Sequence, residues 1–296
     1  MRKLLPKIPN VAVFDTSFHS SIPVHAYTYP IPKEYREKDM RKFGFHGTSV
    51  KYVSQKATEL LHTFYNNKEG TKRDVQQQEQ HHHFQMIVCH LGNGASVTAV
   101  SETQSRETSM GFTPLSGLMM GTRCGDVDPS LVNFAVHALG KDVDQVLDDF
   151  NQRSGLKGMM SDGEHDMRVL LARANAKTAA NADDHDDKQE EAQLAVDMFV
   201  YHLAQHIASC LVALEGPLDA LVFTAGIGEH SAEIRRRTMT QLKYILPNAT
   251  LDDERNAVDG TKTKGVVSKE GAWPLLLDIP TDEEVMIAKE CLRLVV

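Results

Sequence analysis

Residues 86–100, MIVCHLGNGASVTAV, place two apolar runs on either side of a Gly-Asn-Gly break. Both runs have the apolar and β-branched composition that is typical of buried strands. Asn93-Gly94 is a strong signal for a tight turn, so the stretch predicts a two-stranded antiparallel hairpin. Glycines at the tip would also let backbone N–H groups approach an anion. An ordinary turn and a phosphate-holding turn therefore stay open as alternatives.

The chain before this hairpin predicts a strand, a loop and a helix. Residues 11–19, VAVFDTSFH, have the pattern of a short buried strand that ends in an acid, Asp15. The proline-rich stretch that follows is expected to stay non-helical. Apolar residues recur at helical spacing over residues 50–61, and Thr48 or Ser49 is a suitable N-cap for that helix.

The chain after the hairpin continues the alternation of strands and helices. A glycine-rich loop leads into a helix near Pro129, and residues 191–214 predict a long, mostly buried helix. Residues 218–239 predict a strand, a glycine turn and a helix. The chain then closes with a strand end and a helix that starts in a T-x-x-E capping box at Thr281 and Glu284. This order indicates an α/β domain with a substantially mixed sheet.

Composition and charge exclude several classes of protein. The 296 residues carry a net charge of −8, which argues against nucleic acid or an anionic membrane as a partner. The four cysteines are scattered without a C-x-x-C pair, which favours reduced thiols in a cytosol-like compartment. The sequence predicts no secretory signal, and no stretch approaches the roughly 18 apolar residues of a membrane span.

Two polar segments, at about residues 66–84 and 174–191, are interpreted as solvated insertions. The first segment contains His81, His82 and His83 in a row. A solvated tract is the favoured interpretation there, because no supporting metal ligand stands beside the three histidines.

Three residues in the N-terminal half are candidates for chemistry. Asp15 follows a predicted strand, where α/β enzymes place catalytic groups, although a loop cap explains it equally well. Arg123 is the only cation in GLMMGTRCGDVDPS, and it either pairs with Asp126 or Asp128 or faces a phosphoryl group. His46 lies between glycines in FGFHGTS, and a structural role is the commoner one for an isolated histidine.

Two further candidates lie in the C-terminal half. FTAGIGEHSAEIRRRT predicts a helix N-terminus that suits an anion, although Glu229 and Glu233 also fit a plain helix start. In IPTDEE, the capping box gives Glu284 a structural role. Glu283 has no such role and is therefore the candidate metal ligand.

Taken together and in order, these motifs resemble the acetate kinase family, within the acetate and sugar kinase/Hsp70/actin superfamily. The matching run is VAVFDTSFH, FGFHGTS, HLGNGAS, GFTPLSGLMMGTRCGDVDP, FTAGIGEHS and IPTDEE, which covers nearly the whole chain outside the two insertions. The resemblance implies a ribonuclease H-like (actin-like ATPase) domain with a mixed sheet and flanking helices, plus a remnant of a second such domain.

The resemblance also implies an activity: reversible, Mg²⁺-dependent phosphoryl transfer from ATP to acetate, giving acetyl phosphate and ADP. Asp15 matches the catalytic aspartate, His46 and Arg123 match two transition-state stabilisers, and Glu283 matches the metal-associated glutamate. The acetate carboxylate is already ionised near neutral pH, so Asp15 is expected to orient reacting groups and not to act as a base. A cytoplasmic homodimer with no nucleic-acid or membrane partner is expected.

The residues matched to nucleotide binding fall into three segments. They are His90, Leu91, Gly92, Asn93 and Gly94 on the phosphate side, Asp166, Met167 and Arg168 beside the adenosine, and Gly226, Ile227, Gly228, Glu229 and His230 in a second loop.

The sequence departs from the family pattern in two ways. His230 stands where the family usually has Asn, and the usual N-terminal segment with its carboxylate-binding arginine has no counterpart. Residues 1–18 are therefore expected to be a remnant of the acetate-binding domain, residues 19–282 the nucleotide-binding domain, and residues 283–296 a helix that packs back on the former.

Alternatives follow from this shortened pattern. The chain as written is expected to bind nucleotide and to turn over acetate poorly or not at all. A non-catalytic nucleotide-binding or dimerisation module is one alternative, and a propionate or butyrate kinase is another. An organellar location stays open if an N-terminal segment is missing.

Overall fold

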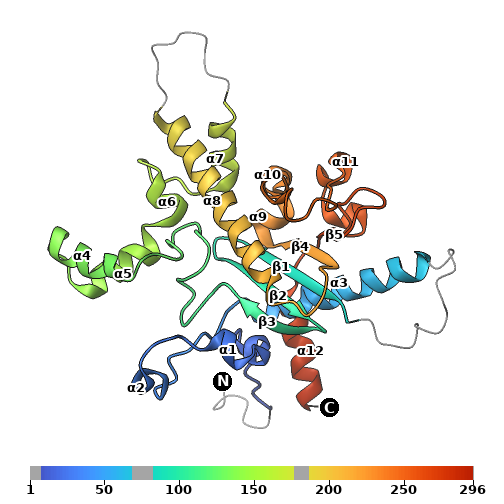
Figure 1. Cartoon of the computed structure of the whole chain (residues 1–296), viewed down its shortest axis with the longest axis horizontal. Helices are drawn as coiled ribbons and strands as arrows, with labels where there is room; N and C mark the ends of the chain where they lie inside the picture. The colour runs from blue at the N-terminus through green and yellow to red at the C-terminus, as the bar shows by residue number, and fades with distance from the viewer. Residues whose placement is uncertain (1–7, 69–82, 177–186, 296) are drawn as a thin grey trace.

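The computed structural model describes residues 8–68, 83–176 and 187–295, and His81 and His82 lie outside these ranges. A five-stranded sheet with the order β3-β2-β1-β4-β5 forms its centre (Figure 1). The strands are β1 (Gln85–Leu91), β2 (Ala95–Ser101), β3 (Gln104–Thr108), β4 (Ala220–Thr224) and β5 (Leu275–Asp278). β1, β2 and β3 form an antiparallel meander, whereas β4 runs parallel to β1 and β5 parallel to β4. The mixed sheet confirms the predicted fold class.

Helices surround this sheet and extend beyond it (Figure 1). They are α1 (Val24–Tyr27), α2 (Lys33–Arg36), α3 (Gly47–Lys68), α4 (Ser130–Leu139), α5 (Val143–Gln152), α6 (Gly155–Met159), α7 (Met167–Ala174), α8 (Asp187–Leu211), α9 (Ala225–His230), α10 (Ala232–Leu242), α11 (Asp253–Asn256) and α12 (Glu283–Val295). Two 3₁₀ turns, η1 (Ser17–Ser21) and η3 (Gly260–Thr263), complete the described elements. None of the helices within these ranges is long and apolar enough to cross a membrane.

The predicted hairpin is confirmed in its register. Leu91 pairs with Ala95, so Gly92, Asn93 and Gly94 form the tip, where the Gly92 N–H donates to the Gly94 carbonyl at 3.0 Å. The tip therefore lies at the carboxyl end of β1, next to the end of the parallel strand β4.

Both faces of the sheet are buried, which explains why residues 86–89 of β1 are continuously apolar instead of alternating. On one face, Met86 shares a core cluster with Val53 of α3. On the other face, Ile87 shares a cluster with Phe199 of α8, which confirms the predicted long buried helix. α12 packs against the outer side of α3, where Lys51 and Glu290 form an ion pair.

Two predictions for the N-terminal stretch are wrong. Residues 11–14 form no strand, and the Phe14 side chain is 67% exposed, because no strand of the described chain lies beside them to complete a ladder. The proline-rich stretch is not free of helix, since α1 and α2 each form a single turn directly after Pro23 and Pro32. Proline is compatible with a helix start, where its missing N–H has no intrahelical partner.

The predicted capping box of the last helix is also wrong. The Val285 N–H donates to Asp282 Oδ1 at 2.9 Å, so Asp282 caps α12. The Thr281 hydroxyl instead lies 2.7 Å from the hydroxyl of Ser49 on α3. At the edges of the first predicted polar segment, α3 runs to Lys68 and Phe84 is buried.

Candidate active site

The candidate residues gather at the carboxyl ends of β1 and β4. The hairpin tip, the start of α3, the loop that carries Arg123, the helix α9 and the turn before α12 all reach this edge. The carboxyl edge of parallel strands is where open α/β sheets bind their ligands.

Asp15 caps the start of α3 from outside the helix. Its Oδ2 accepts from the His46 N–H at 2.7 Å, and its Oδ1 accepts from the Thr48 N–H at 3.4 Å. The carbonyl of Asp15 accepts from the Gly47 N–H at 2.9 Å, and a Cβ at Gly47 would collide with that carbonyl. The predicted N-cap at Thr48 or Ser49 is therefore wrong, because an acid distant in sequence fills that position. The cap alternative for Asp15 is confirmed, and its catalytic role stays a prediction.

His46 adopts a left-handed backbone conformation, with φ of 59°, and its ring stacks on that of His90. The two ring centroids lie 4.0 Å apart, and His46 Nδ1 lies 3.0 Å from Ser96 Oγ. Burial lowers the pKa of His46 to about 4, with Arg123 acting in the same direction and Asp15 opposing it. The imidazole is therefore neutral near pH 7, and it can offer a hydrogen bond to a ligand but no full positive charge.

His90 joins three segments of the chain. Its Nδ1 lies 2.8 Å from Ser49 Oγ, and that hydroxyl in turn lies 2.7 Å from Thr281 Oγ1. Burial lowers the pKa of His90 to about 3, so this ring is neutral as well. The chain of contacts ties β1 to the start of α3 and to the turn before α12.

The hairpin tip lies between the two predicted stabilisers. A Cβ built on Gly94 would lie 3.1 Å from Arg123 Nη1 and 3.3 Å from His46 Nε2. The Gly121 N–H donates to the Asn93 carbonyl at 3.1 Å, which fixes the tip against the loop that carries Arg123. The structure thus brings together Gly94, His46 and Arg123.

The alternative in which Arg123 pairs with Asp126 or Asp128 is wrong. Within the described residues Arg123 forms no ion pair, and its nearest polar partners are the Pro114 carbonyl and Met120 Sδ, at 3.5 and 3.7 Å. Asp126 accepts instead from the Gly117 N–H, and Asp128 accepts from the Ser130 N–H. Each acid orders its own stretch of loop, so the charge of the guanidinium is not neutralised by either acid.

The predicted glycine turn after β4 is in fact the helix α9. Ala225 begins it with φ of 63°, and the Ala225 N–H donates to Glu229 Oε1 at 2.7 Å. The same oxygen accepts from the Thr281 N–H at 3.2 Å. The first N–H group of the helix is thus bonded to a carboxylate of the same helix, which lets α9 start without a loop. A Cβ at Gly226 would meet nothing within 4 Å, so this position is open.

Asp166, Met167 and Arg168 lie at the start of α7. Asp166 is the N-cap of that helix, Met167 is buried in the core, and the Arg168 guanidinium lowers the pKa of Asp166 to about 2. The polar contacts of Asp166 and Arg168 are with each other and with Glu164. These contacts do not join the segment to His46, Gly94 and Arg123.

Glu283 is the first residue of α12, and its carboxyl group interacts electrostatically with that of Asp15. Burial raises the pKa of Glu283, and the charge of Asp15 adds to the effect. Mg²⁺ is often held by one or two carboxylates while substrate phosphates and water supply the other oxygens. A pair of carboxylates whose charges interact, Asp15 and Glu283, fits this mode, whereas a closed protein cage does not fit, since the described ranges hold no cluster of three or more metal-binding side chains.

Several supporting residues do not stand out in the sequence. The patterns place Ser49 and Thr281 at helix caps and Ser96 within a strand, and Arg235 is one of three consecutive arginines. The hydroxyls in FGFHGTS and IPTDEE are the available signal, because both lie beside residues already chosen as candidates.

Comparisons with known proteins agree over nearly the whole chain. Residues 1–289 match the Acetokinase family. An acetate kinase of Carboxydothermus hydrogenoformans is 43% identical over 296 residues, which cover 100% of this chain and 66% of that relative. The structure of Porphyromonas gingivalis acetate kinase aligns with a TM-score of 0.80 at 33% identity, covering 100% of this chain and 66% of that one. A propionate kinase structure from Francisella tularensis aligns with a TM-score of 0.79 at 36% identity, covering 98% and 65%.

Proposed function

The chain belongs to the acetokinase family, and from this premise we propose that it is a phosphotransferase that transfers a phosphoryl group between ATP and the carboxyl group of acetate. The observation that carries the proposal is the position of Gly94, whose missing Cβ would lie within 3.3 Å of both His46 Nε2 and Arg123 Nη1. A glycine tip leaves room for a phosphate between a guanidinium and an imidazole.

The chemistry needs positioning and charge more than proton transfer. Acetate attacks as an ionised carboxylate, and the transferred phosphoryl group spreads negative charge over three oxygens. Arg123 supplies a permanent positive charge to these oxygens. His46, neutral because it is buried, donates or accepts a hydrogen bond through Nε2 while Ser96 and the His90 ring fix its orientation.

The residues that would hold Mg²⁺ are Asp15 and Glu283. When bound there, Mg²⁺ would neutralise phosphate charge and align the reacting oxygens. Asp15 has a second role, with or without a bound metal ion, since it fixes the His46 backbone at the start of α3. ATP and ADP are proposed to lie along residues 90–94 and 226–230, with residues 166–168 beside the adenosine.

A cytoplasmic homodimer is part of the proposal. Support comes from α4 and α5, which project together from the body of the molecule (Figure 1) and carry exposed apolar side chains, including Phe134 at 69% and Leu139 at 65%. All four cysteines are free, which fits a reducing compartment.

The test combines nucleotide binding with product formation. Calorimetry with ADP measures the first, and hydroxylamine trapping of acyl phosphate measures the second, with acetate, propionate and butyrate in parallel. We expect ADP binding and, at most, a low level of acetate-dependent hydroxamate, both weakened in Arg123→Ala. The chain spans 66% of the length of the curated relative, so binding without hydroxamate would assign it to the non-catalytic alternative. Absence of ADP binding would overturn both.

Preference for a longer acid is the second candidate. The similarity to a propionate kinase structure, at 36% identity, favours its inclusion. A higher kcat/KM for propionate than for acetate in the same trapping assay would select it.

A further inference from the structure

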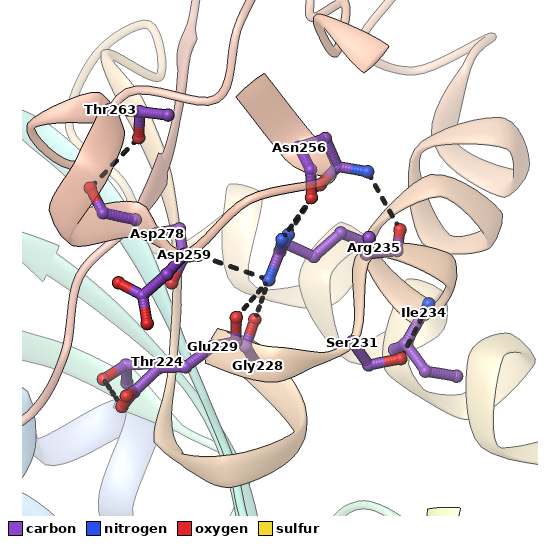
Figure 2. Close-up of polar contacts among 12 residues, drawn as sticks. Thr224, Gly228, Glu229, Ser231, Ile234, Arg235, Asn256, Asp259, Thr263 and Asp278 are labelled. Atoms are coloured by element: carbon purple, nitrogen blue, oxygen red, sulfur yellow. Dashed lines mark hydrogen bonds and ion pairs between the residues drawn. The ribbon is translucent and has the colours of Figure 1, made fainter. Parts of the chain in front are cut away.

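Arg235 is a buried arginine that contacts residues 226–230, the second of the segments proposed to bind the nucleotide. It lies on α10, it is 1% exposed, and Figure 2 shows its guanidinium beside the backbone of Gly228 and Glu229. Its neighbours Arg236 and Arg237 instead pair with Glu233 near the surface. One of three consecutive arginines is thus removed from water, which requires strong compensation.

The compensation consists almost entirely of backbone carbonyls and one amide side chain. Arg235 Nη1 donates to the carbonyls of Gly228 at 2.6 Å and Glu229 at 2.8 Å. Nε and Nη2 donate to the side chain and the carbonyl of Asn256, at 2.7 and 2.8 Å. The carbonyls of Gly228 and Glu229 belong to the last turn of α9, where carbonyl groups have no hydrogen-bond partner within the helix. The guanidinium therefore closes the C-terminal end of α9.

Asp278 provides the buried negative charge nearest to this guanidinium. It ends β5, its side chain is 1% exposed, and its Oδ2 lies 3.4 Å from Arg235 Nη1. Neither of its carboxyl oxygens has a hydrogen-bond partner within the described chain. Gly260 packs directly on this carboxyl group, since a Cβ there would lie 2.8 Å from Asp278 Cγ.

Several charged groups face Asp278 from the elements around it. They are Arg235 from α10, Glu229 and His230 from α9, and Asp259 from the segment before η3. Burial raises the pKa of Asp278 to about 7, Glu229 and Asp259 add to this, and Arg235 and His230 oppose it. The carboxyl group thus changes charge near neutral pH.

Helix α9 has little stability of its own. Its six residues are too few for a helix that is stable alone, and it begins with a left-handed Ala225. Glu229 satisfies its first N–H group, and Arg235 satisfies its last carbonyls. Both ends of the segment are therefore held by side chains.

We propose that Arg235 is a positioning residue of the nucleotide site, which holds the last turn of α9 from below with Asp278 as its counter-charge. The identity of the ligand rests on the proposed function. Arg235 does not touch the nucleotide itself. It acts through the backbone of residues 226–230, and loss of its bonds would let that backbone move away from the ligand.

The principal test compares Arg235→Lys with Arg236→Lys, its exposed neighbour on the same helix. Lysine keeps the charge but cannot offer the planar set of N–H donors. Hydrogen exchange of residues 225–231 is measured without ligand, and ADP affinity is measured by calorimetry. In Arg235→Lys we expect exchange to rise and ADP affinity to fall by at least about tenfold, the effect of one lost charge-assisted contact. Arg236→Lys should match the wild type in both.

A second variant, Asp278→Asn, keeps the test decisive if Arg235→Lys does not fold. It imitates the protonated acid, so its ADP affinity should equal that of the wild type at pH 6. At pH 8, where Asp278 is charged, the wild type should bind ADP more tightly, by at least about threefold. Titration of ADP itself affects both proteins equally and cancels in the ratio.

The outcomes separate this inference from the proposed function. Faster exchange with unchanged ADP affinity, or a wild type to Asp278→Asn ratio that is constant with pH, would overturn the positioning role. A wild type that binds no ADP would overturn the proposed function and with it the role in nucleotide binding. Exchange in the free protein would still decide whether Arg235 orders α9.

Discussion

At the scale of single residues, burial determines the charge of the site histidines as much as their chemical type does. His46 and His90 are ordinary imidazoles whose burial makes them neutral, with pKa values of about 4 and 3. Arg123 forms no ion pair within the described part of the chain, so its guanidinium is a permanent, unpaired positive charge at the hairpin tip. A catalytic role for His46 must therefore rest on hydrogen bonding and shape.

Gly94→Ala tests the space at the tip. The added methyl group would lie 3.1 Å from Arg123 Nη1 and 3.3 Å from His46 Nε2, which places it where we propose the phosphate. We expect ADP affinity to fall by about tenfold or more, while the free energy of unfolding changes by no more than about 1 kcal/mol.

The control for this variant is Gly216→Ala, where a Cβ makes only an ordinary contact of 3.6 Å with Gln85. Calorimetry with ADP and urea denaturation measure both variants. Unchanged ADP binding in Gly94→Ala would contradict the proposed position of the phosphate at the hairpin tip.

The two neutral histidines should make the protein sensitive to acid. Each has a folded-state pKa below its unfolded value of 6.5, so the unfolded chain binds more protons between pH 6.5 and the folded pKa. Stability is therefore present above pH 6.5 and is lost as the pH falls. At pH 5 each histidine is expected to cost roughly 2 kcal/mol.

His90→Gln removes one of these two contributions and leaves a polar side chain near Ser49. Urea denaturation at pH 7 and pH 5 measures the loss for each protein. The variant should lose less stability on acidification than the wild type, whatever its stability at pH 7. An equal loss in both proteins would contradict the burial of a neutral His90.

Among the secondary-structure elements, the helix starts at the sheet edge share one design. α3 directly follows His46, and α9 begins with Ala225. Both residues have a left-handed backbone conformation. In both, a carboxylate accepts from the first N–H groups, Asp15 for α3 and Glu229 for α9. A non-glycine residue in this conformation carries strain, which is common at functional sites.

Ala225→Gly tests that strain. Glycine relieves the left-handed penalty of about 1–2 kcal/mol but loses more backbone entropy on folding, so the unfolding free energy should change little. In Ala220→Gly, a buried position of β4, the same substitution should cost at least about 1 kcal/mol. Equal destabilisation of the two variants by urea denaturation would show that Ala225 is unstrained.

In the molecule as a whole, the buried Arg235–Asp278 pair links stability to pH in the opposite direction to the histidines. The pKa of Asp278 is about 7 in the fold and about 4 in an unfolded chain, so the folded state binds more protons between these values. The contribution to stability is present below pH 4 and is lost as the pH rises through 7.

Asp278→Asn should therefore gain stability relative to the wild type as the pH is raised from 5 to 8. A tenfold difference in acid dissociation constant between the folded and unfolded chains corresponds to about 1.4 kcal/mol, so the relative gain should exceed about 1 kcal/mol. Urea denaturation of both proteins across this range measures it. A constant difference between the two proteins would contradict the raised pKa of Asp278.

Local sequence signals predicted those parts of the molecule that local interactions determine. The turn chemistry of Asn93-Gly94 defined the hairpin, and helical spacing defined α3 and α8. The strand proposed around Asp15 failed, because strand formation depends on a neighbouring strand and not on composition.

Long-range contacts account for the remaining errors at the site. The cap of α3 comes from Asp15, more than thirty residues away in the chain. Likewise, nothing local distinguishes buried Arg235 from exposed Arg236, since only the packing of α10 against α9 and α11 separates them. The signal that selected Asp15, an acid at the end of a strand, applied equally to Asp278.

The order of the sheet has a consequence for synthesis of the chain on the ribosome. β1 and β2 emerge together, but β4 begins at Ala220 and β5 at Leu275, long after β2 ends at Ser101. Pairing across such separations is slow. Before β4 is synthesised, the edge of β1 that pairs with β4 is unpaired. The hairpin is thus expected to need protection by chaperones until β4 is made, and nucleotide can assist folding only after residues 226–230, which follow β4, have been synthesised.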